Sequence, residues 1–89
     1  MTTQQETETR ILFFASFREL LGVSEVSIQL QDSLSVELLL DQLYAQIPDV
    51  KDHLLHRKFL ISVNQQLVSE DMLVTPGDEV ALFPMVTGG

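Results

Sequence analysis

The fold is decided by a helical stretch, SVELLLDQLYAQIP, which occupies residues 35–48 and has strand-like stretches on both sides. Its apolar residues recur at helical spacing and share one face: Val36, Leu39, Leu40, Leu43, Tyr44 and Ile47. Ser35 is a typical N-cap, and Pro48 ends the helix because proline disfavours helical backbone angles in the residue before it. We therefore predict one main amphipathic helix that packs on a sheet.

Two strand patterns precede this helix. Residues 10–15 (RILFFA) are rich in strand formers, and residues 25–30 (EVSIQL) alternate between apolar and polar side chains. Between them, residues 16–22 predict a short helical turn, with Ser16 as its N-cap and Gly22 as its C-terminal stop. The chain thus begins with two strands that the main helix follows.

Three more strand patterns follow the main helix, at residues 59–63 (FLISV), 67–68 and 79–83 (EVALF). Turns are predicted at residues 64–66 and 75–78. Residues 49–58 are predicted to be a polar connection, with room for a helical turn around Leu54 and Leu55. This order allows the last strand to lie beside the first. We therefore predict an α+β fold of the ubiquitin-like β-grasp type, in which a mixed sheet is covered on one face by one main helix.

The chain of 89 residues has room for one domain. We divide it into a disordered leader at residues 1–9, a β-grasp domain at residues 10–84 and a flexible C-terminal tail at residues 85–89. The polar start lacks the features of a signal peptide, and no apolar run is long enough to span a bilayer. A cytoplasmic location is therefore expected.

Charge and cysteine content exclude several classes of function. Thirteen acidic and five basic residues give a net charge of −8, which repels nucleic acids and anionic membranes. The absence of cysteine excludes disulfides, cysteine-based zinc sites and a cysteine nucleophile. His53 and His56 lie near Asp49 and Asp52, but we interpret them as a solvated helical turn and predict no metal site. No catalytic constellation is present, so the chain alone is not expected to be an enzyme.

The first and last strands carry apolar side chains on both faces. If the helix covers one face, the other presents an exposed apolar patch formed by four residues: Leu12, Phe14, Ala81 and Phe83. Exposed patches of this kind usually mark protein interfaces. We therefore predict a partner-binding surface beside the tail.

The sequence ends on Gly88 and Gly89, directly after an apolar strand. Glycine has no Cβ, so these residues can enter a channel too narrow for a side chain. Residues 84–89 reach roughly 20 Å when extended, which would carry a terminal carboxylate into a partner's buried site. The alternative interpretation is a frayed terminus without function.

Five blocks resemble the MoaD family of ubiquitin-like sulfur carriers, the small subunits of molybdopterin synthase. They are residues 11–15 (ILFFA), 18–22 (RELLG), 63–65 (VNQ), 77–84 (GDEVALFP) and 86–89 (VTGG). The resemblance covers about residues 10–89 and rests on the order, spacing and terminal placement of the blocks together.

The resemblance implies a sulfur carrier function. A MoeB-type enzyme would adenylate the carboxylate of Gly89 with ATP, and sulfur would then displace AMP to leave a thiocarboxylate. The carrier would dock on a large, MoaE-type subunit to form a heterotetramer. There it would donate sulfur to cyclic pyranopterin monophosphate, forming the molybdopterin dithiolene. ATP is consumed by the activating enzyme, and no cofactor is expected to stay bound to this chain.

The resemblance also assigns roles to individual residues. Gly89 carries the sulfur, and the residues that enter the partner with it are Val86, Thr87 and Gly88. The predicted partner interface consists of Phe14, Arg18, Phe83 and Met85. Met85 departs from the family pattern, because relatives often have a second proline there, which would stiffen the tail.

Two other function classes share these features. One is a sulfur carrier for another pathway, such as thiamine thiazole synthesis or tRNA thiolation, whose carriers have the same fold and Gly-Gly end. The other is a ubiquitin-like modifier or a plain interaction module. The blocks at residues 18–22 and 86–89 favour the molybdopterin branch.

Overall fold

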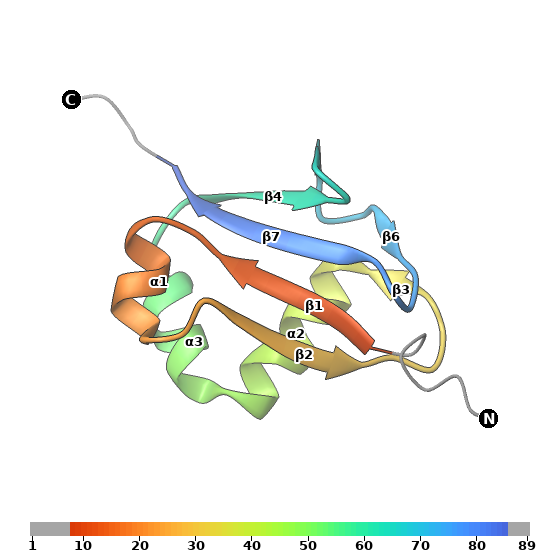
Figure 1. Cartoon of the computed structure of the whole chain (residues 1–89), viewed down its shortest axis with the longest axis horizontal. Coiled ribbons are helices and arrows are strands. Elements are labelled where there is room, and N and C mark those ends of the chain that lie inside the picture. The colour runs from red at the N-terminus through yellow and green to blue at the C-terminus, as the bar shows by residue number, and fades with distance from the viewer. Residues whose placement is uncertain (1–7, 86–89) are drawn as a thin grey trace.

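The computed structural model describes residues 8–85, which form seven strands and three helices (Figure 1). In chain order they are β1 (Glu8–Phe13), α1 (Ser16–Leu21), β2 (Glu25–Gln29), β3 (Leu34–Ser35), α2 (Val36–Gln46), α3 (Pro48–Leu54), β4 (Phe59–Val63), β5 (Gln66–Val68), β6 (Leu73–Val74) and β7 (Glu79–Pro84).

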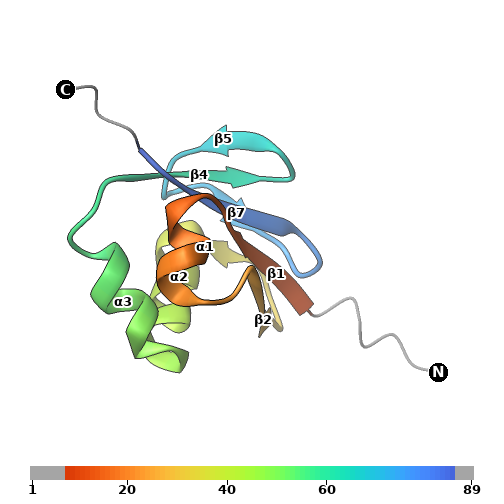
Figure 2. The ribbon, with the colours of Figure 1, turned by 60° about the vertical axis from the view of Figure 1, so that its left-hand side comes forward.

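The main sheet has five strands in the order β2-β1-β7-β4-β5. β7 lies in its centre, parallel to β1 and antiparallel to β4, and the other neighbouring strands are antiparallel. Figure 2 shows the helices gathered on one side of this sheet. The predicted mixed β-grasp sheet, with the last strand beside the first, is therefore confirmed.

A second sheet was not predicted from the sequence. It pairs the two-residue strands β3 and β6 through Leu34 with Val74 and Ser35 with Leu73. Segments this short carry no measurable alternation, so only the folded chain reveals them. Their pairing places the N-terminus of α2 beside the loop that precedes β6.

The predicted main helix is confirmed as α2. The Ser35 hydroxyl accepts a hydrogen bond from the Leu38 backbone amide at 3.2 Å, as an N-cap does. Its buried residues meet the inner face of the sheet in one core, which includes Ile11, Phe13, Leu39, Leu43 and Leu82. Burial of each such side chain contributes about 1.5–3 kcal/mol.

The boundary of the predicted leader was wrong. β1 begins at Glu8, which pairs with Gln29 of β2, and Thr9 is fully buried. The Thr9 hydroxyl has no hydrogen-bond partner among residues 8–85. Glu8 and Thr9 are polar and do not show an apolar strand pattern. They belong to β1 because their backbones pair with β2. Residues 1–7 lie outside the described residues, so the disorder predicted there stays a prediction.

Two further details around the helices differ from the sequence-based predictions. Ser16 is the first helical residue of α1, and Ala15 precedes it as the N-cap with a φ of 54°, while Gly22 ends the helix with a φ of 76° as predicted. The connection predicted at residues 49–58 contains a full helix, α3, which starts at Pro48. Proline is well suited to that first position because it lacks only an amide that would be unpaired anyway.

The two turns at the far end of β4 and β7 are joined by side-chain hydrogen bonds. The Asp78 carboxylate accepts from the Thr75 amide at 2.9 Å, the Thr75 hydroxyl at 3.0 Å and the Asn64 amide group at 3.1 Å. Asn64 in turn accepts from the Glu79 backbone amide at 3.0 Å. Burial raises the pKa of Asp78, but these donors outweigh it and hold the pKa below its usual value of 3.8.

Replacing Asp78 should weaken the fold near neutral pH and less so in acid. In Asp78→Asn an amide group takes the place of one accepting oxygen, which leaves at least one donor unpaired and costs about 1–2 kcal/mol. Because the folded pKa is lowered, the carboxylate's contribution is present above 3.8 and is lost as the pH falls through the folded value. Urea unfolding across this pH range measures the difference.

The matched control is Asp32→Asn, an exposed residue in the loop after β2. It should change the free energy of unfolding by less than about 0.5 kcal/mol at every pH. A loss for Asp78→Asn that stayed constant down to about pH 2 would contradict the charged role of Asp78.

Candidate functional site

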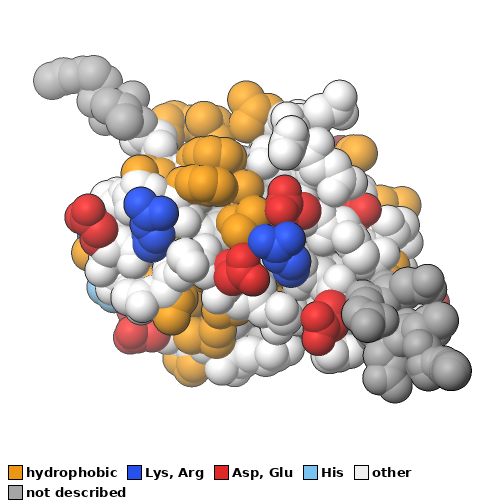
Figure 3. Space-filling view, viewed as in Figure 1, with side chains coloured by type: hydrophobic (Ala, Val, Ile, Leu, Met, Phe, Trp, Pro, Cys, Tyr) orange, Lys and Arg blue, Asp and Glu red, His pale blue; other side chains and the backbone are white. Residues whose placement is uncertain are grey.

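An apolar patch lies on the face of the main sheet opposite the helices. We define the open-face patch by the side chains that strand register places there: Leu12, Phe14, Leu60, Leu67, Ala81 and Phe83. Figure 3 shows apolar side chains gathered over β7 and β4 on this face. A hollow of about 250 Å³ is lined by most of these residues, together with Ser62, Gln65 and Glu79.

Phe14 and Phe83 form the centre of the open-face patch. Their rings are stacked, with centroids 4.8 Å apart and planes 4° from parallel. The Phe14 backbone amide donates to the Leu82 carbonyl at 3.2 Å, which fixes the end of β1 against β7. Phe14 is 38% exposed and Phe83 is partly buried, so the pair presents a rigid aromatic surface to solvent.

The predicted apolar patch is present on the open face, but its set of residues differs from the prediction. Ala81 is 6% exposed, because Leu12 and Ser62 of the neighbouring strands cover a side chain as small as a methyl group. Leu60 and Leu67 extend the patch and were missed. Leu60 could be assigned to the patch only from its pairing with Phe83, and that pairing depends on the register between strands that are distant in sequence.

Charged side chains border the open-face patch on the β2 side. Arg10 bonds to Glu25 at 2.9 Å and lies 3.4 Å from Glu79. The hydrogen bond from Arg10 to Glu25 and the charges of both carboxylates raise the pKa of Arg10 above its already high ordinary value. The positive charge of Arg10 is therefore balanced by the two carboxylates, and the three residues form a polar border beside the patch.

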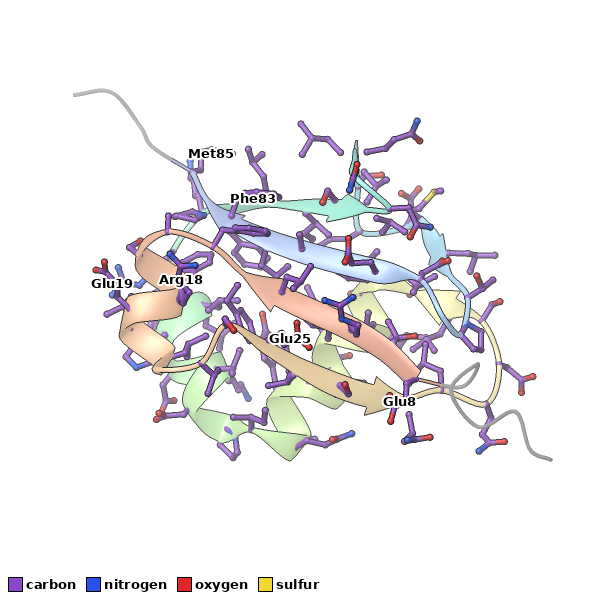
Figure 4. The ribbon with its side chains drawn as sticks, viewed as in Figure 1. Glu8, Arg18, Glu19, Glu25, Phe83 and Met85 are labelled. Carbon is purple, nitrogen blue, oxygen red and sulfur yellow. The ribbon has the colours of Figure 1, made fainter. Side chains whose placement is uncertain are left out.

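Two other predicted interface residues lie at the end of β7 from which the tail departs. Figure 4 shows Arg18 on α1 and Met85 after Phe83 at this end of the molecule. Arg18 is exposed and makes no ion pair within residues 8–85. Met85 is 40% exposed, and its amide donates to the Lys58 carbonyl at 3.1 Å. Phe14, Arg18, Phe83 and Met85 thus lie at one end of the sheet.

The predicted tail residues Val86, Thr87, Gly88 and Gly89 lie outside the described residues, so their roles stay predictions. Within residues 8–85, no group of three or more His, Asp or Glu side chains is arranged to hold a metal ion. No helix in this range is long and apolar enough to cross a membrane.

Comparison with known proteins identifies similar chains. Residues 11–89 match the model of the ThiS family. The chain is 45% identical over 80 residues to the molybdopterin synthase sulfur carrier subunit of Escherichia coli K12, which covers 90% of this chain and 98% of that one. It is 41% identical to the subunit of the same name from Haemophilus influenzae, covering 89% and 96% of the two chains.

A solved structure shares the fold. SAMP1 of Haloferax volcanii, the small archaeal modifier protein 1, matches with a TM-score of 0.75 and 26% sequence identity. The match covers 92% of this chain and 99% of SAMP1.

Proposed function

We propose that this chain, which belongs to the ThiS family, is the sulfur carrier subunit of a molybdopterin synthase. The observation that carries the proposal is the identity of 45%, over nearly the full length of both chains, to the Escherichia coli subunit of that name. The resemblance to small synthase subunits inferred from the sequence is confirmed by the same relatives.

Gly89 is the reacting residue in this proposal. A carboxylate oxygen of Gly89 attacks the α-phosphorus of ATP, and pyrophosphate leaves. A sulfide-level sulfur donor then attacks the carbonyl carbon, the bond to the AMP oxygen breaks, and a thiocarboxylate remains. Its sulfur bonds to a carbon of cyclic pyranopterin monophosphate as a carbon–oxygen bond at that carbon breaks and the oxygen leaves with the electron pair. Water then cleaves the acyl–sulfur bond, which leaves sulfur on the substrate and regenerates the carboxylate.

The chemistry explains why activation is needed. A carboxylate resists nucleophiles because its charge is delocalised, whereas the mixed anhydride with AMP offers a good leaving group. The thiocarboxylate is a soft nucleophile that ionises readily, as a thiolate does. Because the chain contains no cysteine, none of its own side chains competes for the activated sulfur.

The open-face patch supplies docking in this proposal. Its stacked pair, Phe14 and Phe83, and the exposed Met85 lie where the chain leaves β7, so a partner that binds them receives the tail from a fixed direction. The partners are a large, MoaE-type subunit, in a heterotetramer with two copies of each chain, and a MoeB-type adenylating enzyme. The cycle takes place in the cytoplasm, where ATP is consumed by that enzyme.

One observation favours a second candidate function. The likeness to SAMP1, a small archaeal modifier protein, fits a modifier whose Gly89 carboxylate is joined to lysine amines of other proteins. Both functions start from an activated carboxylate. They differ in the nucleophile that follows, which is sulfur for a carrier and an amine for a modifier.

Intact-mass measurement of the protein from its own host tests the proposal. We expect a fraction in which sulfur replaces one oxygen, and we expect the large subunit to be retained in a pull-down. If sulfur never appears even with the activating enzyme and a sulfur donor present, the carrier function is wrong. Lysine conjugates in place of sulfur would support the modifier, and retention of a thiazole synthase would support another sulfur pathway.

A further inference from the structure

A hollow with a positively charged lining lies beside the point where the chain leaves β7. It has a volume of about 660 Å³, and its charged lining residues are Arg57 and Lys58. The remaining lining comes from α1 and the end of β7: Ala15, Ser16, Phe17, Pro84 and Met85. A hollow without a carboxylate is unexpected on a chain with thirteen acidic and five basic residues.

The backbone holds both basic residues close to the start of the tail. The Lys58 carbonyl accepts from the Met85 amide at 3.1 Å, so Lys58 lies directly beside the first residue of the predicted tail. The Arg57 Nε donates to the His53 carbonyl at 2.9 Å. This bond orients the guanidinium and leaves its two terminal nitrogens without an acceptor among residues 8–85.

Neither of these two charges is paired, in contrast to Arg10, and Arg18 and Lys51 likewise have no ion pair within residues 8–85. Arg10 is neutralised by Glu25 and Glu79, whereas neither Arg57 nor Lys58 has an ion pair within the described part of the chain. Both side chains are exposed. Positive potential therefore persists at the tail end of a molecule that is strongly acidic as a whole.

The hollow lies at the same end of β7 as the aromatic centre of the open-face patch. Phe14 belongs to the patch and Ala15 to the hollow, and the same boundary falls between Phe83 and Pro84 on β7. Because Met85 is bonded to Lys58, a partner that covers the stacked rings and also holds the chain beyond Met85 comes close to Lys58 and to its neighbour Arg57. Charges at the rim of an interface guide encounter and fix orientation more than they add affinity.

We propose that Arg57 and Lys58 form a cationic collar that docks against carboxylates at the mouth of the large subunit's tail channel, an inference that rests on the proposed function. The collar has the opposite sign to the net charge of −8 that the chain carries, so it specifies how the carrier is rotated about its tail when it docks. Lys58 thereby becomes a specificity residue.

Two charge reversals of the same chemical type test the collar. Lys58→Glu and Lys51→Glu lower the net charge equally, but Lys51 lies on α3 and does not line the hollow. Titration calorimetry with the purified large subunit at low salt should show roughly tenfold weaker binding for Lys58→Glu and little change for Lys51→Glu. The difference should shrink at about 1 M salt, where the Debye length falls to about 3 Å.

The outcomes separate the collar from the proposed function. If the unmodified chain does not bind the large subunit, the proposed function itself fails. If it binds and Lys58→Glu binds equally well or more tightly, no acidic mouth faces the collar and the inference is wrong. Arg57→Glu gives a second test at the same hollow, and the melting temperature of each variant verifies that it is folded.

Discussion

Phe83→Asp should abolish tight binding to the large subunit while the chain remains folded. Phe83 stacks on Phe14 at the centre of the open-face patch, and central aromatic anchors of an interface typically cost 2 kcal/mol or more when lost. A charge at this position would also be desolvated by the partner without a counterion. We expect binding to weaken by about a hundredfold or more, measured by titration calorimetry.

The control for this substitution is Leu38→Asp on α2. Leu38 is 53% exposed, and it lies outside the open-face patch in the helical layer. Its replacement adds the same charge and should leave binding within about twofold of the original, because it lies outside the interface. A collapse of the melting temperature in Phe83→Asp would instead assign Phe83 to the core, contrary to its place on the open face of the sheet.

Gly88→Val should stop sulfur loading while docking persists. The proposed role of Gly88 is to pass through a narrow channel, and a branched side chain both widens the tail and removes backbone conformations that only glycine adopts. Displacing a reacting group by about 1 Å can cost about a hundredfold in rate. We expect a loss of at least this size in the rate at which sulfur replaces oxygen, measured by intact mass with the activating enzyme present.

Gly88→Ala distinguishes the effect of side-chain width from the effect of lost backbone freedom. It adds only one methyl group but also removes the backbone conformations that only glycine adopts. It should load sulfur faster than Gly88→Val, and both variants should still bind the large subunit through the open-face patch. If Gly88→Val loads at the original rate, Gly88 has no steric role. That result would leave Gly89 as the reacting residue untouched, since the intact-mass test addresses it separately.

The sequence predicts most of the fold because strand and helix periods are local properties. Residues 79–83 alternate with period two, and α2 repeats its apolar residues along one face, so both were found without a structure. The start of β1 was missed because Thr9 is buried through pairing with Ile28, a contact between segments distant in the chain. The end of α1 was found because Gly22 has an intrinsic preference for left-handed angles.

The candidate site was only partly predictable for the same reason. Alternation along single strands placed Phe14 and Phe83 on the open face, but Leu60 joins them only through its register with Phe83. Nothing local marks Lys58 either, because its proximity to Met85 arises from the hydrogen bond that ends the β4 and β7 pairing. Such neighbours cannot be identified from local sequence patterns, because they come together only when distant strands pair in the sheet.

The central position of β7 also determines how the carrier withstands mechanical load. The tail continues from a strand that is bonded on one side to β1 and on the other to β4. Tension applied through the tail therefore acts along β7 and strains both rows of hydrogen bonds together, rather than peeling them one at a time from an edge. The domain should consequently resist unfolding when force is applied at its C-terminal end.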